Sequence, residues 1–399
     1  MKILHTADWH LGKTIMYTGF ELLPLEEKIL NTIIKTIEDE SVDIVLIGGD
    51  VFDSPNPSGK AERVFTKTLK TMADLNCPVF IIAGNHDSPE RLAALNPLSQ
   101  EHLIFIGGFV RDDFSGVSIE RGRWRIEARE RYFLIDDRDK GEKLVLHLLP
   151  YASEYRLGEA FFSDSDLREL EYAEKIKELV TEPFPFDADL KVLLSHLFVK
   201  EAKANPKEER PLFIGGSYHI PTSYFPESYD VVALGHLHSP QIINNSIVYS
   251  GSILPFTPDL KEAEKYVYVI ELEKDKKDLK KIPLNIEELI EIRVVSSMDE
   301  ALEPVAGDRI LYLLFKDLPS HLLPDDIKRL ERAHEDRLAV FSAEIKGRQT
   351  EDDIADTNIE NLSPREWFKR FYISKKSEEP PDDVMDLFLK LAEDEEAAL

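Results

Sequence analysis

Short apolar runs alternate with helical patterns through roughly the first 275 residues. The runs at 1–6, 43–48 and 78–83 have the length and apolar character of buried strands. Between them, residues 25–39 and 60–75 place apolar side chains at helical spacing. Later strands are predicted at 144–149, 190–195, 230–234, 247–250 and 266–271. This alternation is typical of an α/β protein and predicts a core of two packed, βαβ-rich sheets with helices outside.

The pattern changes in the second half of the chain. Residues 272–283 (LEKDKKDLKKIP) are charged and end in proline, which indicates either a domain boundary or a solvated helix or hairpin. We therefore assign 1–275 to the core domain. Strand-like segments on both sides of a helical stretch near 324–334 predict a small α+β domain at 285–347. Residues 348–361 are polar and acidic and are interpreted as a linker.

The last segment, 362–399, is predicted to form two short helices. Ser363 is a candidate N-cap, with Pro364 at the first helical position and Glu366 completing a capping box. Large apolar side chains follow in both helices, namely Trp367, Phe368, Phe371, Tyr372, Val384, Leu387, Phe388 and Leu391. Two such helices have little core of their own. They are expected to form a hairpin that binds a partner protein, or to pack back onto the parent domain.

The composition indicates an intracellular protein. The chain has 399 residues, of which 43% are hydrophobic, so it can bury the cores of two or three domains. The single cysteine, Cys77, excludes a disulfide framework and a cysteine-based zinc site and fits a reducing cytosol. The start, MKILHTADWH, lacks the apolar stretch of a signal peptide, and no apolar run of about 18 residues is present. We expect a soluble cytoplasmic protein with no membrane segment.

Five short motifs of potential ligand residues each follow a predicted strand. In chain order they are Asp8-Trp9-His10, Gly49-Asp50, Gly84-Asn85-His86-Asp87, Ser195-His196 and Gly235-His236-Leu237-His238. Ligand-binding side chains converge at the carboxyl ends of strands in α/β sheets. We therefore expect the five motifs to meet at one point.

The residue types of these motifs indicate a pair of metal ions. Carboxylate, imidazole and amide ligands without a thiolate suit manganese, with iron, zinc or magnesium as alternatives. The Asp-x-His and His-x-His spacings put both side chains on the same side of an extended backbone. Seven ligands are too many for one tetrahedral site and would fill two sites that share a bridging carboxylate. Metals about 3.5–4 Å apart stabilise both the attacking and the leaving oxygen of a phosphoryl displacement, which predicts a phosphoesterase.

Each motif alone has a structural alternative. Asp8 or Asp50 could cap a helix or a turn, and His196 could be a core histidine. The GNHD and GHLH motifs could be simple turns. Five motifs in order, each after a strand, favour the metal centre. His5 and His147 lie within apolar strands and are interpreted as core residues. The remaining histidines without a matching constellation are His102, His219, His321 and His334.

The combination DxH, GD, GNHD, SH and GHxH resembles the calcineurin-like metallophosphoesterases. The longer strings ILHTADWHLGK, GGDVFDSPNPS and AGNHDSPERL resemble the SbcD-type DNA repair nucleases within that superfamily. The resemblance covers the whole chain. It implies a two-sheet metallophosphoesterase core, a capping (DNA-recognition) domain at 285–347, and a C-terminal helical hairpin at 362–399 that binds an SbcC-like ATPase.

The resemblance also implies a ligand set and a catalytic residue. Metal one would be held by Asp8, His10, Asp50 and His238, and metal two by Asp50, Asn85, His196 and His236, with Asp50 bridging. His86 would be a non-ligand that stabilises the transition state or protonates the leaving oxygen. Asp87 would orient His86 or its loop, or cap the turn. Archaeal and eukaryotic relatives tend to carry a histidine where this chain has Asp53, and the sequence leaves the role of that residue open.

The implied activity is that of a manganese-dependent DNA nuclease, with 3′→5′ exonuclease action on duplex ends and endonuclease action on single strands or hairpins. The ATPase would gate access, and the nuclease core is expected to form a homodimer within a heterotetramer. No G-x4-G-K-[ST] loop is present, so the partner would bind the ATP. The alternatives are a small-substrate or cyclic-nucleotide phosphodiesterase and a scaffold without metals. The GDVFD and GNHD strings differ from the GDxVDR and GNHE of protein phosphatases, and the complete ligand set disfavours the scaffold.

The net charge of −27 limits how this chain can bind DNA. Phosphate neutralisation by basic side chains supplies most non-specific affinity, so an acidic chain should bind DNA weakly by itself. Bound divalent cations would invert the charge of an acidic cleft, and a partner would supply the remaining grip. The densest basic stretch contains Arg121, Arg123, Arg125, Arg129 and Arg131. It could contact the DNA backbone, but interleaved glutamates favour a solvated hairpin.

Overall fold

The computed structural model describes most of the first 345 residues and a few positions near the C-terminus. The described ranges are 1–15, 18–157, 165–203, 219–256, 264–274, 276–318, 322–345, 368–369, 372, 380–381 and 384–385. The chain divides into two compact units, Met1–Leu314 with Leu323–Ser342, and Phe315–Leu322 with Ala343–Leu399. The predicted linker at 348–361 lies outside the described residues, as does most of the predicted helical hairpin at 362–399.

Among the described residues, the first sheet has six strands in the order β18-β17-β1-β4-β5-β6. Their bounds are β1 Lys2–Thr6, β4 Ile44–Ile47, β5 Val79–Ile82, β6 Ile104–Gly107, β17 Tyr266–Glu273 and β18 Lys276–Pro283. Strands β1, β4, β5 and β6 are parallel, whereas β17 pairs antiparallel with both β1 and β18. The strands predicted at 1–6, 43–48, 78–83 and 266–271 are confirmed.

The charged run at 272–283 belongs to this sheet. Strand β18 pairs with β17 along its whole length, from Pro283 opposite Tyr266 to Lys276 opposite Glu273. Its side chains are exposed or half-buried, and Lys276, Lys280 and Lys281 are exposed as is common in an edge strand. Strands β17 and β18 therefore form a hairpin, which is one of the alternatives given for this charged run. The first sheet continues to Pro283 rather than ending at 275.

Among the described residues, the second sheet has eight strands in the order β15-β16-β14-β11-β10-β9-β8-β7. Their bounds are β7 Ser118–Arg121, β8 Trp124–Arg129, β9 Tyr132–Asp137, β10 Glu142–Leu149, β11 Leu190–His196, β14 Val231–Gly235, β15 Gln241–Ile243 and β16 Ile247–Tyr249. The central strands β10, β11, β14 and β16 are parallel. The flanking strands are antiparallel. The strands predicted at 144–149, 190–195, 230–234 and 247–250 are confirmed.

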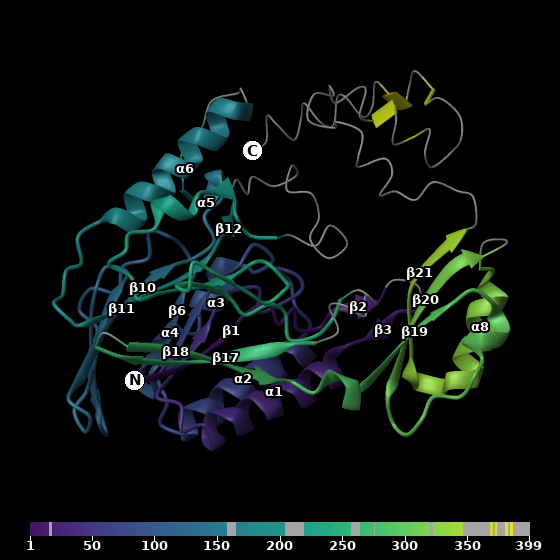
Figure 1. Ribbon diagram of the computed structural model, residues 1–399, viewed down its shortest axis with the longest axis horizontal. Helices are drawn as coiled ribbons and strands as arrows, with labels where there is room; N and C mark the ends of the chain where they lie inside the picture. The colour runs from purple at the N-terminus through teal and green to yellow at the C-terminus, as the bar shows by residue number, and fades with distance from the viewer. Residues whose placement is uncertain are drawn as a thin grey trace. The chain divides into compact units, whose positions relative to one another are not determined.

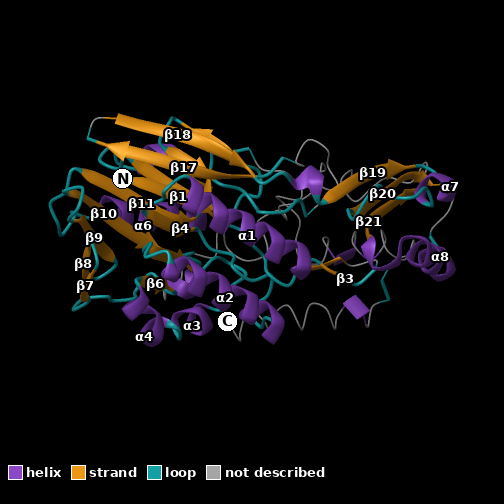
Figure 2. Ribbon diagram, turned by 90° about the horizontal axis from the view of Figure 1, so that it is seen from below, coloured by secondary structure: helices purple, strands orange, loops and turns teal. Residues whose placement is uncertain are grey.

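The two sheets pack face to face, and helices cover their outer faces (Figure 1). In β4, Ile44 and Leu46 belong to the core between the sheets, whereas Val45 and Ile47 belong to the core beneath the helices. The covering helices are α1 Leu23–Asp39 and α2 Gly59–Asp74 on the first sheet and α6 Ser165–Thr181 on the second. Helices α1 and α2 lie side by side (Figure 2). The predicted α/β class with two sheets is confirmed.

Shorter elements complete the core. These are β2 Thr14–Ile15, β3 Phe20–Glu21, α3 Pro89–Ala93, α4 Asn96–Ser99, α5 Glu154–Leu157, β12 Phe198–Val199 and β13 His219–Ile220. None of the helices in the described part of the chain combines the length and the apolar character needed to cross a membrane.

A small sheet of order β19-β20-β21 follows the core along the chain. Its elements are β19 Ile290–Val295, α7 Met298–Ala301, β20 Ile310–Leu318, α8 Pro324–His334 and β21 Leu338–Ile345. The buried ring of His334, at the end of α8, lies 2.7 Å from the carbonyl oxygen of Ala301 in α7. The strands and the helix predicted within 285–347 are therefore present.

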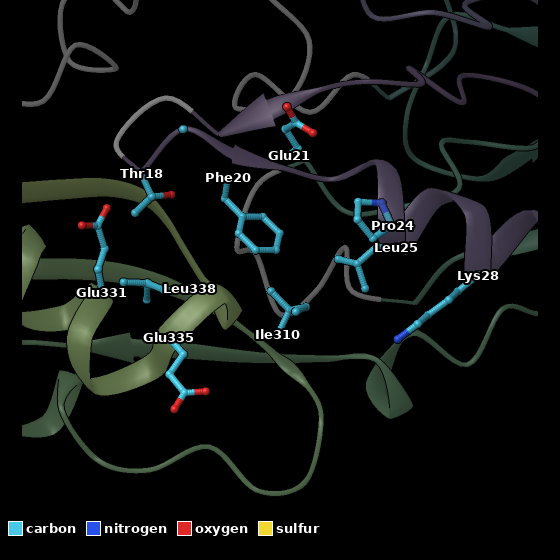
Figure 3. Close-up of a pocket in the computed structure, with 11 residues that line it drawn as sticks. Thr18, Phe20, Glu21, Pro24, Leu25, Lys28, Ile310, Glu331, Glu335 and Leu338 are labelled. Atoms are coloured by element: carbon cyan, nitrogen blue, oxygen red, sulfur yellow. The ribbon is translucent and has the colours of Figure 1, made fainter. Parts of the chain in front are cut away.

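A cavity of about 630 Å³ lies between the start of α1 and the small sheet (Figure 3). Its lining consists of Thr18, Gly19, Phe20, Glu21, Pro24, Leu25, Lys28, Ile310, Glu331, Glu335 and Leu338. None of the five motifs contributes to it, and three of its four charged side chains are glutamates. The cavity is therefore separate from the predicted chemistry.

Candidate metal centre

The five motifs lie where parallel strands of both sheets end. Asp8 and His10 follow β1, Asp50 follows β4, Asn85 follows β5, His196 ends β11, and His236 and His238 follow β14. Two buried histidines contact backbone carbonyls across the sheets at this end. Nε2 of His5 lies 3.0 Å from the carbonyl oxygen of Leu234, and Nδ1 of His196 lies 2.8 Å from that of Gly48. The side chains of the five motifs therefore gather in one buried cluster.

The backbone of this cluster adopts conformations that are rare for residues other than glycine. The φ angles are 50° at Asp8, 48° at His10, 48° at Asp50 and 95° at His236. Each such residue costs roughly 1–3 kcal/mol and persists only where the surrounding structure fixes it. Gly84 is required for close approach, because a Cβ there would lie 2.1 Å from Oδ1 of Asp50. Strain concentrated at one point is typical of a functional site.

One group of ligand atoms centres on His10. Its Nε2 lies 3.1 Å from Nε2 of His238 and 3.6 Å from Oδ2 of Asp50. Ligand atoms of Asp8, His10 and His238 all lie within 4.8 Å of one another. Both carboxylate oxygens of Asp8 accept a hydrogen bond from the backbone N–H of His236, at 3.0 and 3.1 Å, which fixes this side chain between two motifs.

A second group centres on Asn85. Its Oδ1 lies 2.9 Å from Nε2 of His196 and 3.0 Å from Nδ1 of His236. The two histidine nitrogens are 3.3 Å apart. Oδ2 of Asp50 lies 3.6 Å from His196, the same distance that separates it from His10 in the first group. Asp50 therefore stands between the two groups, where a bridging carboxylate would stand.

The donor atoms fit a pair of metal ions. Neighbouring ligands around an ion with bonds of about 2.1 Å lie roughly 3.0–3.4 Å apart. The contacts among the histidine nitrogens and the Asn85 oxygen span 2.9 to 3.3 Å, and Oδ2 of Asp50 lies slightly farther out, 3.6 Å from His10 and from His196. Burial lowers the pKa of all four ring ligands, His10, His196, His236 and His238, in the case of His236 to about 3. The rings are therefore neutral and present lone pairs, which is the form that binds a metal.

The charge of Asp50 is favoured by its surroundings. Burial opposes ionisation, but the histidines His196, His10 and His86 and the backbone N–H of His86 outweigh it and lower the pKa of Asp50 to about 2. The N–H of His86 donates to Oδ1 at 2.8 Å, which leaves Oδ2 directed at the two ligand groups. An ionised carboxylate at this position is what two cations require.

His86 is placed beside the cluster by a backbone contact. Its Nδ1 lies 3.0 Å from the carbonyl oxygen of Asp53, which can only accept, so Nδ1 carries a hydrogen. The ring packs edge-to-face against His10 with centroids 4.7 Å apart. A ring nitrogen of His86 also lies within 4.8 Å of ligand atoms of His10 and Asp50. Only Nε2 remains to face the cluster, either as a ligand or as a group that contacts the substrate.

Asp53 has a supporting role that the sequence left open. Its Oδ1 lies 2.6 Å from Nζ of Lys13 and 3.4 Å from Nδ1 of His10. A carboxylate behind a ligating histidine fixes the ring orientation and raises its basicity. The pKa of Asp53 falls well below its ordinary range because His10 and Lys13 outweigh the effect of burial. The side chain therefore orients His10 while its carbonyl orients His86.

Asp87 holds the loop of Asn85 and His86. Its buried carboxylate accepts hydrogen bonds from the backbone N–H groups of Val51, Phe52 and Gly84, at 3.1, 2.9 and 2.9 Å. Burial and the charge of Asp50 raise the pKa of Asp87 to about 7, against the opposing effect of these three donors. The contacts to Val51 and Phe52 fit a residue that orients its loop, and the contact to Gly84 fits a cap of the turn.

The arginine-rich stretch forms the β7-β8-β9 meander. Arg123 pairs with the buried Asp43 at 2.6 Å and Asp137 at 3.2 Å. Asp43 precedes β4, whose opposite end leads to Asp50. The other arginines also have protein partners. Arg121 donates to the carbonyl of Glu101, and Arg129 donates to the carbonyl of Pro185. Arg125 pairs with Glu120 and Glu127, and Arg131 contacts Glu182 and His147. These contacts support the solvated hairpin over a DNA-binding surface.

The two histidines interpreted as core residues are buried. His5 spans the two sheets, and burial lowers its pKa to about 4. His147 lies 2.8 Å from the hydroxyl of Tyr229. Sequence reasoning missed Lys13, Arg156 and the buried Lys265, whose Nζ donates to the carbonyl oxygen of His238 at 3.0 Å. No local motif marks these residues, because their partners are distant in sequence.

Comparison with solved structures gives two weak likenesses. A protein of Thermus thermophilus has a TM-score of 0.37 and 14% identity, covering 70% of this chain and 98% of that one. A dimetal phosphatase from Danio rerio has a TM-score of 0.39 and 12% identity, covering 71% of this chain and 96% of that one. Both TM-scores are too low to support an argument.

Comparison of sequences is decisive. Residues 1–240, which hold all five motifs, match the family of calcineurin-like phosphoesterases. The SbcD subunit of the nuclease SbcCD from Bacillus subtilis (strain 168) is 30% identical over 411 residues, and the alignment covers 98% of each chain. The dimetal ligand cluster and both matches agree. The chain belongs to the calcineurin-like phosphoesterase family and is a homologue of the SbcD nuclease subunit.

Proposed function

We propose that this chain is the nuclease subunit of an SbcCD-like DNA repair complex and hydrolyses DNA phosphodiesters. The observation that carries this proposal is the two-part ligand cluster around Asp50. It occurs in a chain that matches a nuclease subunit over 98% of both sequences. The cluster supplies the chemistry of phosphoester hydrolysis, and the end-to-end match indicates the substrate. We further propose 3′→5′ exonuclease action on duplex ends and endonuclease action on single strands or hairpins.

The seven ligands divide between two metals that share Asp50. We assign Asp8, His10, Asp50 and His238 to metal one, and Asp50, Asn85, His196 and His236 to metal two. The short contacts within each group support this division. Nitrogen and oxygen donors without sulfur favour Mn²⁺, and the same donors would accept Mg²⁺, Fe²⁺ or Zn²⁺.

The chain's own groups then organise the cleavage step. Two bound cations would neutralise the phosphate charge and activate the attacking water. A new bond forms between the water oxygen and phosphorus as the water loses a proton to solvent, and the bond to the 3′-oxygen breaks with its electron pair remaining on that oxygen. With Nδ1 of His86 held by the carbonyl of Asp53, a second proton on Nε2 can pass to the departing oxygen or stabilise its charge.

The domain organisation and partners follow from the same homology. We propose a nuclease core that begins at residue 1 and extends through β18, a capping domain at 285–347, a linker at 348–361, and a hairpin at 362–399 that binds an SbcC-like ATPase. The net charge of −27 supports dependence on such a partner for DNA binding. A cytoplasmic homodimer, forming a heterotetramer with the ATPase, completes the proposal.

The test compares two substrates with the full chain and Mn²⁺. Labelled duplex DNA with free ends should be degraded from its 3′ ends, and cleavage should stop when the metal is chelated. Bis-p-nitrophenyl phosphate serves as a diester that any dimetal phosphodiesterase can hydrolyse. Rapid turnover of this small diester with no cleavage of duplex, hairpin or single-stranded DNA, with and without the ATPase, would favour a small-substrate phosphodiesterase instead.

A further inference from the structure

Arg156, in α5, lies against the loop that carries Asn85 and His86. Its Nη1 donates to the carbonyl oxygen of Gly84 at 2.7 Å, and its Nη2 donates to that of Asp87 at 2.8 Å. We propose that Arg156 is a positioning residue for DNA cleavage, whose guanidinium clamps this loop so that His86 meets the scissile phosphate. The inference rests on the nuclease function proposed above and adds a residue to its machinery.

The planar guanidinium suits this task. Its two terminal nitrogens share one carbon, so carbonyl oxygens bound to both must lie close together, and the loop between Gly84 and Asp87 is held as a tight bend. This loop lies between β5 and α3 and has no helix or strand ladder to satisfy its carbonyls. A lysine at position 156 could bind one carbonyl but could not reproduce the fork.

The opposite side of the same loop is held independently. The Asp87 carboxylate binds the backbone of Val51 and Phe52, and the His86 ring binds the carbonyl of Asp53. Loss of Arg156 would therefore leave the loop attached to the core but free to shift on one side. This arrangement predicts misplacement of His86 rather than unfolding of the loop.

Arg156 is also linked to the second ligand group. Its guanidinium lies over the ring of Tyr151, 5.1 Å from the centroid. The backbone N–H of Tyr151 donates to the carbonyl oxygen of Ala83, at 3.0 Å, just before the loop. The Tyr151 ring stacks near His236 at 6.4 Å and meets His196 edge-on at 5.9 Å. Arg156 thus contacts the loop, while the neighbouring Tyr151 packs against His196 and His236 of the cluster.

The chain offers a matched control. Arg129 likewise donates one Nη to a backbone carbonyl, that of Pro185 at 3.0 Å, and lies 4.9 Å from the centroid of the Phe186 ring. It is in β8, three strands along the sheet from β11 and its His196. Arg129→Ala removes the same kinds of contact without touching the loop of His86.

The experiment measures kcat, KM and bound manganese for the full chain. A shift of about 1 Å at a catalytic group can reduce the rate about 100-fold, so Arg156→Ala should lower kcat on DNA by this order. KM and metal content should stay as in the unaltered chain, and Arg156→Lys should recover only part of the rate. Arg129→Ala should be unchanged. Adding Arg156→Ala to His86→Ala should cause no further loss, because both remove the same contribution.

Four results would overturn the inference. An unchanged kcat for Arg156→Ala would show that the clamp is dispensable. A raised KM with unchanged kcat would make Arg156 a DNA contact. Additive losses in the double variant, or loss of manganese, would indicate general damage to the centre. Failure of the proposed function is distinguishable, because the unaltered chain would then not cleave DNA at all.

Discussion

The carbonyl oxygen of Asp53 lies 3.0 Å from Nδ1 of His86, and Oδ1 of the same aspartate lies 3.4 Å from Nδ1 of His10. One residue therefore orients both a proposed ligand and the proposed catalytic histidine, through different atoms. The arrangement gives Asp53, whose role the sequence left open, two contacts at the centre. Substitutions of His86 and of Asp53 should therefore produce different defects, the first in the chemical step and the second in metal binding.

Substitution of His86 should slow the chemistry strongly while sparing the metals. His86→Ala removes a proton donor or charge-stabilising group, which is worth about 10²–10⁴-fold in rate. Because His86 is assigned no coordination bond, bound manganese measured by elemental analysis should equal that of the unaltered chain. Asp50→Asn is the comparison, since it weakens the shared ligand. Metal loss in His86→Ala as large as in Asp50→Asn would show that His86 is a ligand.

Substitution of Asp53 should weaken the metals instead. Asp53→Ala removes the carboxylate behind His10 and the partner of Lys13 but keeps the backbone carbonyl that holds His86. Loss of such an outer carboxylate typically reduces metal affinity about 10–100-fold. A manganese titration followed by activity should therefore show a rightward shift with near-normal kcat at saturation. Asp74→Ala, at an exposed ion pair in α2, is the control. A lower kcat at saturating metal with unchanged affinity would contradict this role.

The metal centre could be predicted from the sequence because each of its motifs is a short, contiguous stretch of the chain. Each motif directly follows an apolar strand, so chain order and strand direction suffice to bring Asp8, Asp50 and His196 together. Arg156 was not predicted, because its partners Gly84 and Asp87 are 72 and 69 residues away. Strand β6 was not predicted, although its apolar run IFIG is as long as those of β4 and β5. The charged side chains of β18 obscured an edge strand, whose identity depends on its pairing with β17.

Deletion of residues 362–399 should abolish binding to an SbcC-like ATPase while sparing the metal centre. The predicted hairpin presents large aromatic and aliphatic side chains that suit a partner surface. Hydrolysis of bis-p-nitrophenyl phosphate by the shortened chain should match that of the full chain, which serves as the internal control. Co-purification with the ATPase measures the partner interaction. Undiminished co-purification would place the binding surface elsewhere in the chain.

Glu26 is an unusual group for a core. It is fully buried in α1 among apolar side chains, and Oε2 accepts a hydrogen bond from the backbone N–H of Gly12 at 2.8 Å. Its Oε1 has no hydrogen-bond partner among the described residues. Burial raises the pKa of Glu26 to about 8, reinforced by Asp53 and opposed by Gly12 and Lys13. Near neutral pH the folded chain therefore holds a proton that the unfolded chain releases.

This proton should make the free energy of unfolding depend on pH. Below the unfolded pKa near 4.5, both states hold the proton. As the pH rises to about 8, the folded state alone retains it, so stability falls by about 1.4 kcal/mol per pH unit. Glu26→Gln cannot titrate. The free energy of unfolding of this variant, measured with urea in the presence of a metal chelator, should therefore depend less steeply on pH between these limits. Glu27→Gln, at the half-exposed neighbour in α1 that pairs with Lys67, should leave the slope unchanged. Equal slopes for Glu26→Gln and the unaltered chain would mean that Glu26 is ionised in the folded protein.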